Sequence, residues 1–197
     1  MSSSVLLMSM SADGYIAGPD DRPGNPGGDD FMRLHEWYLN ADGEVGRPDG
    51  EPGEIWDELH STGATLVGRR TAEQVDYYGG DHHGVPIFVL SRDPSPVDYE
   101  NVHVVSDIET AMAQAKAAAG DKDVLVHGAV TAQLALAAGV LDELQISQVP
   151  VLFGSGLRLF DVLPERVELE IVRVIDTPRA THLRYRVRRS GSSTASS

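Results

Sequence analysis

Three short segments of the sequence place glycine, hydroxyl and guanidinium groups where a helix is expected to follow a strand. The first is Val67-Gly68-Arg69-Arg70-Thr71. Its glycine lets a ligand approach the backbone closely, and the start of a helix offers unpaired N–H groups to an anion. Because two arginines stand beside it, the segment suits a phosphate or pyrophosphate group. A tight turn with solvated arginines explains the same residues equally well.

The other two segments repeat this chemistry at the ends of later strands. Val126-His127-Gly128-Ala129-Val130-Thr131 combines small residues with a threonine hydroxyl in the first turn of the expected helix. Leu90-Ser91-Arg92 ends another strand with a hydroxyl and a guanidinium group, which suit a further phosphate. Each segment alone has an ordinary structural explanation, because turns between strands and helices commonly use small residues. Together, on successive strand ends, they predict a nucleotide-binding crevice.

The remaining candidate motifs are weaker. Ser11-Ala12-Asp13-Gly14 follows the first expected strand, so it is either a simple turn or the start of an active-site loop. Gly154-Ser155-Gly156 begins like a dinucleotide fingerprint but lacks the third glycine and follows a late strand. We interpret Asp81-His82-His83 as a loop with solvated histidines, because no distant third ligand accompanies it. The sequence therefore predicts no metal site.

The apolar pattern indicates which elements position these groups. We expect strands over 5–10, 64–67, 86–90, 102–105, 123–126, 144–151, 167–174 and 182–187. Helices are expected over 31–39, about 55–60 and 129 to about 138. Two further helices should begin at the capping boxes 71–74 and 106–109. In the last strand Leu183, Tyr185 and Val187 alternate with arginines, which predicts one buried and one solvated face. The class is α/β, with a mixed sheet covered by helices on both faces.

Length, composition and charge exclude several classes of protein. The 197 residues suit a single domain over 1–189 with a disordered tail at 190–197. The net charge of −14 argues against nucleic acid and anionic membranes as partners. Cysteine is absent, which excludes disulfides and thiol catalysis. No apolar run is long enough to span a bilayer, and the start of the chain lacks the features of a signal peptide, so we expect a cytoplasmic protein.

Taken in order, five segments resemble the dihydrofolate-reductase-like superfamily, and within it the reductase domain of the riboflavin-pathway deaminase/reductase. They are SADGYIAG (11–18), VGRRTAEQ (67–74), FVLSR (88–92), VLVHGAVTAQLALAAGVLDEL (124–144) and VPVLFGSGLRLF (149–160). The resemblance implies a three-layer α/β/α fold, NADPH as cofactor, a small-molecule substrate and, in many members, a homodimer.

The resemblance also implies roles for individual residues. The pyrophosphate and the adenosine ribose would contact Gly68, Arg69, Arg70 and Thr71, and the 2′-phosphate would contact Ser91 and Arg92. The start of the second helix would hold the diphosphate through Gly128, Ala129, Val130 and Thr131. The nicotinamide and the substrate would be flanked by Ala12, Asp13 and Gly14. We predict Asp13 as the acid that protonates or anchors the substrate; Asp29, Asp30 and Glu36 are further candidate carboxylates.

This sequence departs from the family pattern at two places. Ala129 stands where a second glycine is usual, and His127 stands where riboflavin-pathway reductases generally carry a glutamate. Residues 1–60 hold 13 acidic and three basic residues, so we expect a substrate that is not strongly anionic. The expected reaction is hydride transfer from NADPH to a C=N or C=O bond of a small heterocycle. The alternatives are dihydrofolate reductase proper and a non-catalytic nucleotide sensor on the same fold.

Overall fold

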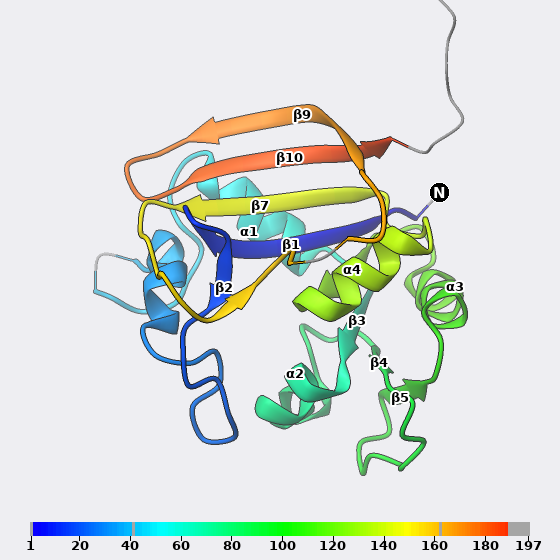
Figure 1. Cartoon of the computed structure of the whole chain (residues 1–197). Coiled ribbons are helices and arrows are strands. Elements are labelled where there is room, and N and C mark those ends of the chain that lie inside the picture. Colours follow the sequence, from blue (N-terminus) through cyan, green and yellow to red (C-terminus); the bar gives the residue numbers. More distant parts are fainter. Residues whose placement is uncertain (1, 41, 162, 189–197) are drawn as a thin grey trace, which may run out of the picture.

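The computed structural model describes residues 2–40, 42–161 and 163–188 of the chain. Within them an eight-stranded sheet has the order β5-β4-β3-β6-β1-β7-β10-β9 (Figure 1). Its strands are β1 (Ser4–Ser11), β3 (Ala64–Gly68), β4 (Ile87–Leu90), β5 (Val102–Val105), β6 (Val124–His127), β7 (Glu143–Val149), β9 (Glu168–Asp176) and β10 (Thr181–Arg188). A second, small sheet pairs β2 (Tyr15–Ala17) with β8 (Leu157–Arg158).

The large sheet is parallel from β5 to β7 and antiparallel at its other end. β1 lies between β6 and β7 and pairs in parallel with both, so that Leu6 is opposite Val126 on one side and Leu144 on the other. β10 runs antiparallel to both β7 and β9. This arrangement confirms the mixed sheet that the sequence predicts. It also brings the carboxyl ends of β1, β3 and β6 to the same edge.

Helices cover both faces of the parallel part of the sheet. They are η1 (Phe31–Tyr38, a 3₁₀ helix), α1 (Pro52–His60), α2 (Arg69–Gln74), η2 (Asp76–Gly80, 3₁₀), α3 (Ile108–Ala119) and α4 (Ala129–Ala137). Leu6 packs into the core beneath α3 and α4, whereas its neighbour Leu7 packs into the core beneath η1 and α1. Successive residues of a strand point to opposite faces, and both faces of β1 are therefore buried.

Two of the predicted helix starts are wrong in detail. α2 begins at Arg69 after Gly68, without a side-chain cap, so Thr71 is a residue of the helix and not its N-cap. At α3 the cap is Asp107, whose carboxylate accepts a hydrogen bond from Thr110 N at 2.8 Å, and not Ser106. In both cases a neighbouring residue already has the extended backbone that the cap position requires.

The faces of β10 also differ from the prediction. Arg184, expected on the solvated face, has a side chain only 19% exposed because α1 covers it: it pairs with Glu58 at 3.2 Å and with Glu143 at 2.6 Å. On the opposite face no helix of the described residues packs over the end of the sheet (Figure 1). Leu183 and Tyr185 are consequently only half-buried there.

No helix within the described residues has the length and apolar character that crossing a bilayer requires. The tail predicted at 190–197 lies outside the described residues.

Two isoleucines provide a test of how α1 is held. Ile55 on α1 is fully buried among Leu7, Leu34 and Trp37, whereas Ile171 on β9 is 63% exposed. Ile55→Ala should lower the free energy of unfolding by about 2–5 kcal/mol, since it removes buried methyl groups and leaves a cavity. The matched change Ile171→Ala should cost less than about 1 kcal/mol. Urea unfolding of both variants measures the difference, and equal costs would contradict the packing described.

Candidate functional site

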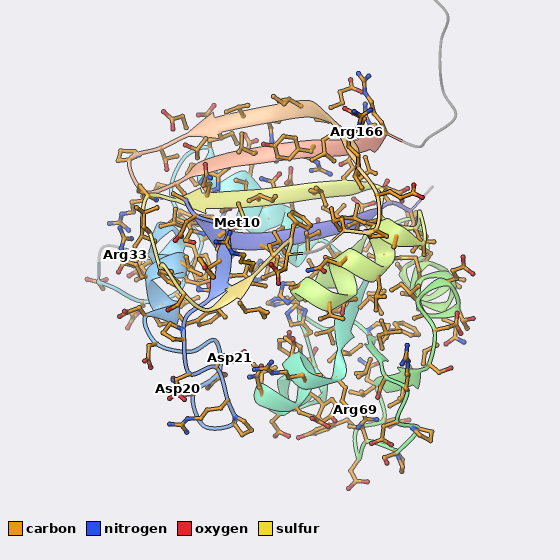
Figure 2. All side chains as sticks on the ribbon, in the orientation of Figure 1. Met10, Asp20, Asp21, Arg33, Arg69 and Arg166 are labelled. Carbon is orange, nitrogen blue, oxygen red and sulfur yellow. The ribbon has the colours of Figure 1, made fainter. Side chains whose placement is uncertain are left out.

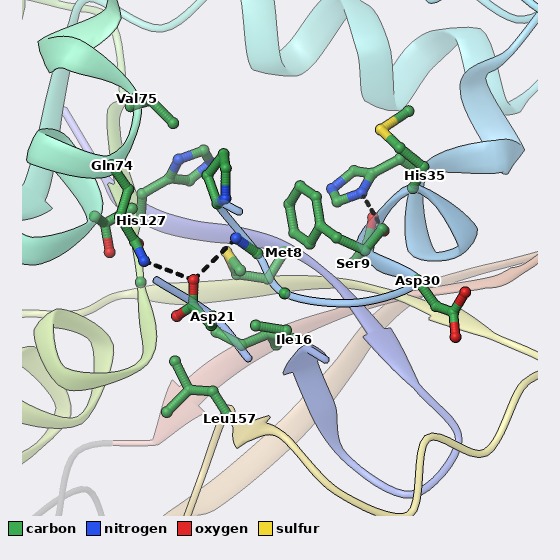
Figure 3. A pocket seen from close by; sticks show the side chains of 18 of the residues that line it. Met8, Ser9, Ile16, Asp21, Asp30, His35, Gln74, Val75, His127 and Leu157 are labelled. Carbon is green, nitrogen blue, oxygen red and sulfur yellow. Dashed lines mark hydrogen bonds between the residues drawn. The ribbon is translucent and has the colours of Figure 1, made fainter. Parts of the chain in front are cut away.

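A cavity of about 910 Å³ lies beside β1, at the carboxyl edge where β6 ends (Figure 3). One wall is aromatic and comes from η1, α1 and the segment after α2: Phe31, Trp37, Tyr38, Trp56 and Tyr78. The opposite wall consists of Met8, Ile16, Ala17 and Leu157 from β1, β2 and β8. The loop at 25–30 closes one side. This volume is typical of sites for small molecules and cofactors.

Asp21 fastens the loop after β2 to helix α2 across the cavity. Its carboxylate accepts hydrogen bonds from Gln74 Nε2 at 2.6 Å and from Gly27 N at 2.9 Å (Figure 3). Arg70 donates to the Asp21 carbonyl oxygen at 2.7 Å and to its carboxylate at 3.0 Å. The Asp21 side chain is only 11% exposed. These contacts form a clasp, made of Asp21, Arg70 and Gln74, that holds the loop over the cavity.

Two histidines stand on opposite sides of the cavity (Figure 3). At the end of β6, His127 Nδ1 lies 3.3 Å from the Tyr78 hydroxyl, and burial lowers the pKa of His127 to about 4. On η1, His35 Nδ1 lies 3.1 Å from the Phe31 carbonyl oxygen, and burial lowers its pKa as well. Burial raises the pKa of Tyr78 to about 12, so that phenol stays protonated. At neutral pH these groups are all uncharged.

The two predicted glycine segments meet at one junction. β3 and β6 are neighbours, with Val67 opposite His127, so the residues that follow them start α2 and α4 side by side. A Cβ added to Gly68 would lie 3.1 Å from Thr131 Oγ1, and one added to Gly128 would lie 3.2 Å from Thr71 Oγ1. Each glycine therefore packs against the threonine of the other segment. Thr71 and Gly128 both line the cavity.

The arginines predicted to hold phosphates are engaged by the protein instead of lining the cavity. Arg69 (Figure 2) donates to Ser91 Oγ at 2.8 Å and to the carbonyl oxygens of Asp93 and Ser95 at 2.9 Å each. The structure thus brings together Arg69, predicted at the pyrophosphate and adenosine ribose, and Ser91, predicted at the 2′-phosphate. Arg92, next in the chain, is exposed. Arg70 is part of the clasp with Asp21.

The residues that follow Gly128 face different surroundings. Ala129 is 3% exposed and belongs to the core under α4, which turns its methyl group away from the cavity. Thr131 is 1% exposed, and Val130 is 66% exposed. The extra methyl group at Ala129, where the family usually has glycine, is therefore buried in the core and is not part of the cavity lining.

Asp13 lies outside the cavity, as do Ala12 and Gly14. The Asp13 carboxylate accepts hydrogen bonds from Ser11 Oγ at 2.6 Å, Gly154 N at 2.8 Å and Phe153 N at 3.1 Å. Together these hydrogen bonds lower its pKa to about 2, the one from Ser11 most strongly. This geometry favours a role in holding the loop at 151–154 beside β1. The catalytic role of Asp13 stays a prediction.

Most of the residues that form the cavity have no sequence motif that marks them as part of a site. Asp21 has no recognisable motif, and Trp37 and Tyr38 carry the pattern of an ordinary amphipathic helix. Of the three further candidate carboxylates, Asp29 and Asp30 line the cavity. The third, Glu36, forms an ion pair with Arg33 at 2.8 Å and lies outside it.

The interpretation of His82 as a solvated histidine is wrong. Its side chain is buried (7% exposed) against Tyr78 and His83, and its Nδ1 lies 2.9 Å from Thr65 Oγ1. Burial lowers its pKa to about 3. No group of three or more potential metal-binding side chains is found in the described part of the chain.

Residues 4–183 match the model of the RibD C-terminal domain family. The chain belongs to the RibD C-terminal domain family. A search of curated proteins found no match.

Solved structures share the fold of this RibD C-terminal domain. A protein attributed to riboflavin biosynthesis from Shewanella sp. PV-4 has a TM-score of 0.71 and 23% identity, covering 95% of this chain and 99% of that one. Dihydrofolate reductase from Enterococcus faecalis, complexed with NADP(H), has a TM-score of 0.61 and 18% identity (95% and 97% covered). A pyrimidine reductase-like protein from Corynebacterium diphtheriae has a TM-score of 0.60 and 15% identity, covering 95% of this chain and 92% of that one. These likenesses establish the dihydrofolate-reductase-like fold.

Buried His82 makes the stability of the protein depend on pH. Its pKa is about 3 in the folded state and near the ordinary 6.5 in the unfolded state, so only the unfolded state gains a proton below pH 6.5. Stability should therefore fall as the pH drops from about 6.5 toward 3, by up to about 1.4 kcal/mol per pH unit for this group. Above pH 6.5 the group contributes no pH dependence.

The measurement is urea unfolding between pH 7.5 and 5. His82→Gln, which removes the titrating ring, should weaken the pH dependence, to which buried His127 also contributes, whereas the same change at exposed His103 should leave it unchanged. A pH dependence that is identical in both variants would contradict the assignment.

Proposed function

We propose that this protein is an NADPH-dependent reductase that transfers hydride to a C=N or C=O bond of a small heterocyclic substrate. The observation that carries the proposal is the continuity of the cavity with the glycine–threonine junction: Thr71 and Gly128 belong to both. A cofactor that enters there would have its phosphates beside the junction and its reactive ring among the aromatic side chains. Membership of the RibD C-terminal domain family and the NADP(H)-bound dihydrofolate reductase of the same fold support this assignment.

The residues at the junction fit such a cofactor. Gly68 and Gly128 leave the backbone bare at the starts of α2 and α4, where a side chain would occupy the space of a phosphate. Gly128 has φ +90°, a conformation that other residues rarely adopt. Ser91 and Arg92 would contact the 2′-phosphate, as predicted from the sequence, and Arg69, which donates to Ser91 Oγ, would lie beside it. When bound, NADPH supplies the hydride.

The chain itself would orient the substrate and exclude water. The aromatic wall provides flat, apolar contacts, and the clasp holds the loop at 25–30 over the cavity. We propose that Asp13 acts as an anchor for the loop at 151–154, because a carboxylate with a pKa of about 2 is ionised at neutral pH and is a poor proton donor.

Cofactor binding tests the proposal directly. Both tryptophans, Trp37 and Trp56, line the cavity, so their fluorescence should report the titration of NADPH and of NADH. NADPH should bind more tightly than NADH, and its affinity should fall as salt rises. Gly68→Ala should weaken NADPH binding about 10-fold, because the added methyl group would crowd Thr131 and the phosphate site.

The matched control is Gly46→Ala, where nothing lies within 4 Å of the added Cβ and φ is not positive. It should leave NADPH affinity unchanged. If neither cofactor binds, the reductase proposal is wrong. Tight NADPH binding without oxidation on a panel of heterocycles would favour a nucleotide sensor, and rapid dihydrofolate reduction blocked by methotrexate would favour a dihydrofolate reductase.

We also propose that a second copy of this chain covers the bare face of β9 and β10. Three β9 residues on or beside that face are exposed: Leu169 by 38%, Ile171 by 63% and Val174 by 52%. Two copies related by a two-fold axis present the same apolar face to each other, so each could cover the face of the other. An exposed apolar edge strand otherwise invites aggregation.

Light scattering after size-exclusion chromatography measures the mass in solution. The wild type should be a dimer, and Ile171→Asp should be a monomer with unchanged NADPH binding. Val45→Asp, at a residue 58% exposed on a distant loop, is the matched control and should stay a dimer. A monomeric wild type at about 50 μM would contradict the proposal.

A further inference from the structure

The charge of the cavity restricts what its substrate can be. None of the lining residues, all of them in the described part of the chain, is lysine or arginine, whereas three are aspartates. The guanidinium group of Arg70 is held by Asp21. Asp29 and Asp30 stand exposed at the rim. An anionic group placed beside the aromatic wall, away from the glycine–threonine junction, would lose its hydration without gaining a cation, and the rim would repel it.

Two neutral imidazole rings of the cavity each have a ring nitrogen without a partner among the described residues. His35 Nδ1 lies at hydrogen-bond distance from a carbonyl oxygen, which can only accept, so Nδ1 carries the proton and Nε2 is an acceptor. Neither His35 Nε2 nor His127 Nε2 bonds to a described residue, and neither is sealed from solvent, so both open onto the cavity. His35 therefore offers a lone pair to a bound molecule.

His127 offers the opposite chemistry. The Tyr78 phenol is a good donor and a weak acceptor, and it lies 3.3 Å from His127 Nδ1. When the phenol donates to Nδ1, the proton of the neutral imidazole resides on Nε2. His127 then presents an N–H donor on the side of the cavity opposite the His35 acceptor (Figure 3).

From this geometry we infer that the cavity takes a planar, uncharged heterocycle with a carbonyl or ring-nitrogen acceptor at one edge, bound by His127, and an N–H donor at the opposite edge, bound by His35. The aromatic wall contacts its faces, and a substrate that carries a phosphate or carboxylate group beside this wall is disfavoured, whereas the phosphates of NADPH would lie at the glycine–threonine junction. Tyr78 is the positioning residue that fixes the tautomer of His127. The inference rests on the proposed function for the identity of the site, but binding of the heterocycle needs no cofactor.

Quinolin-4(1H)-one is a suitable probe, because its carbonyl and N–H groups lie on opposite edges of a flat ring. Its affinity is compared by calorimetry, with and without NADPH, with those of 1-methylquinolin-4-one, indole and 4-oxo-1H-quinoline-2-carboxylate. The N-methyl compound lacks the donor, indole keeps an N–H donor but lacks the acceptor, and the carboxylate adds a negative charge. We expect each to bind about 10-fold more weakly or worse than quinolin-4(1H)-one, since a polar group is left unpaired or a charge is buried.

Variants assign the preference to the two histidines. His127→Leu should abolish the advantage over indole, and His127→Gln, which keeps an N–H donor, should restore part of it. His35→Leu should abolish the advantage over the N-methyl compound. Tyr78→Phe should reduce the advantage over indole, as expected if it positions His127. His103→Leu, at an exposed histidine far from the cavity, should leave all four affinities unchanged. Thermal melting verifies that each variant is folded.

Equal affinities for all four molecules, tighter binding of the carboxylate, or no binding of any of them would overturn the inference. These outcomes are separable from failure of the proposed function. If NADPH binds and the neutral heterocycle shows no preference, only the substrate class is wrong. If the heterocycle binds with the expected preference and NADPH does not bind, only the reductase proposal is wrong.

Discussion

The parallel pairing of β1 with both β6 and β7 is the constraint on which the structure depends. A central strand with both faces buried cannot shift by one residue without exchanging Leu6 and Leu7 between two different cores. Its start is fixed as well, because Ser4 N donates to the Asp142 carboxylate at 3.0 Å, and that carboxylate also accepts from Lys116 at 2.7 Å. With the register set, the ends of β1, β3 and β6 are placed on one edge, and the cavity is formed there.

Around that edge the arginine side chains bind other groups of the protein. Arg69 holds the segment after β4, Arg70 holds the loop after β2, and Arg173 joins β9 to Glu58 of α1 at 2.7 Å. Inside the rim, where Asp29 and Asp30 stand, the cavity retains neutral hydrogen-bonding groups among aromatic rings. Selectivity in such a site comes from matching donors and acceptors, because a mismatch leaves a polar group unpaired away from water.

Much of the fold could be predicted from the sequence, because buried strands such as 102–105 and 123–126 and the helix that ends at Gly120 have strong local patterns. The glycine segments were also recognisable, since they follow strands and precede helices. Short elements were missed: β2 and β8 have three and two residues, too few for a periodic pattern. The clasp of Asp21 was not predictable, because its partners Arg70 and Gln74 lie about fifty residues away.

The burial of particular groups could not be predicted either. His82 and Arg184 belong to polar residue types that are normally exposed. Only the tertiary arrangement places Tyr78 over His82 and α1 over Arg184. Local sequence describes what a residue prefers, whereas these two positions are decided by neighbours that the chain brings from elsewhere.

The crossed contacts of Gly68 with Thr131 and of Gly128 with Thr71 link two segments that are sixty residues apart in the chain. A larger side chain at Gly68 needs a smaller one at Thr131, so a single change there is unfavourable where a paired change is tolerated, whereas Gly128 is also restricted by its φ of +90°. Substitutions at Gly68 and Thr131 should therefore arise together during divergence. A designer who wishes to reshape this edge of the sheet would have to redesign both turns together.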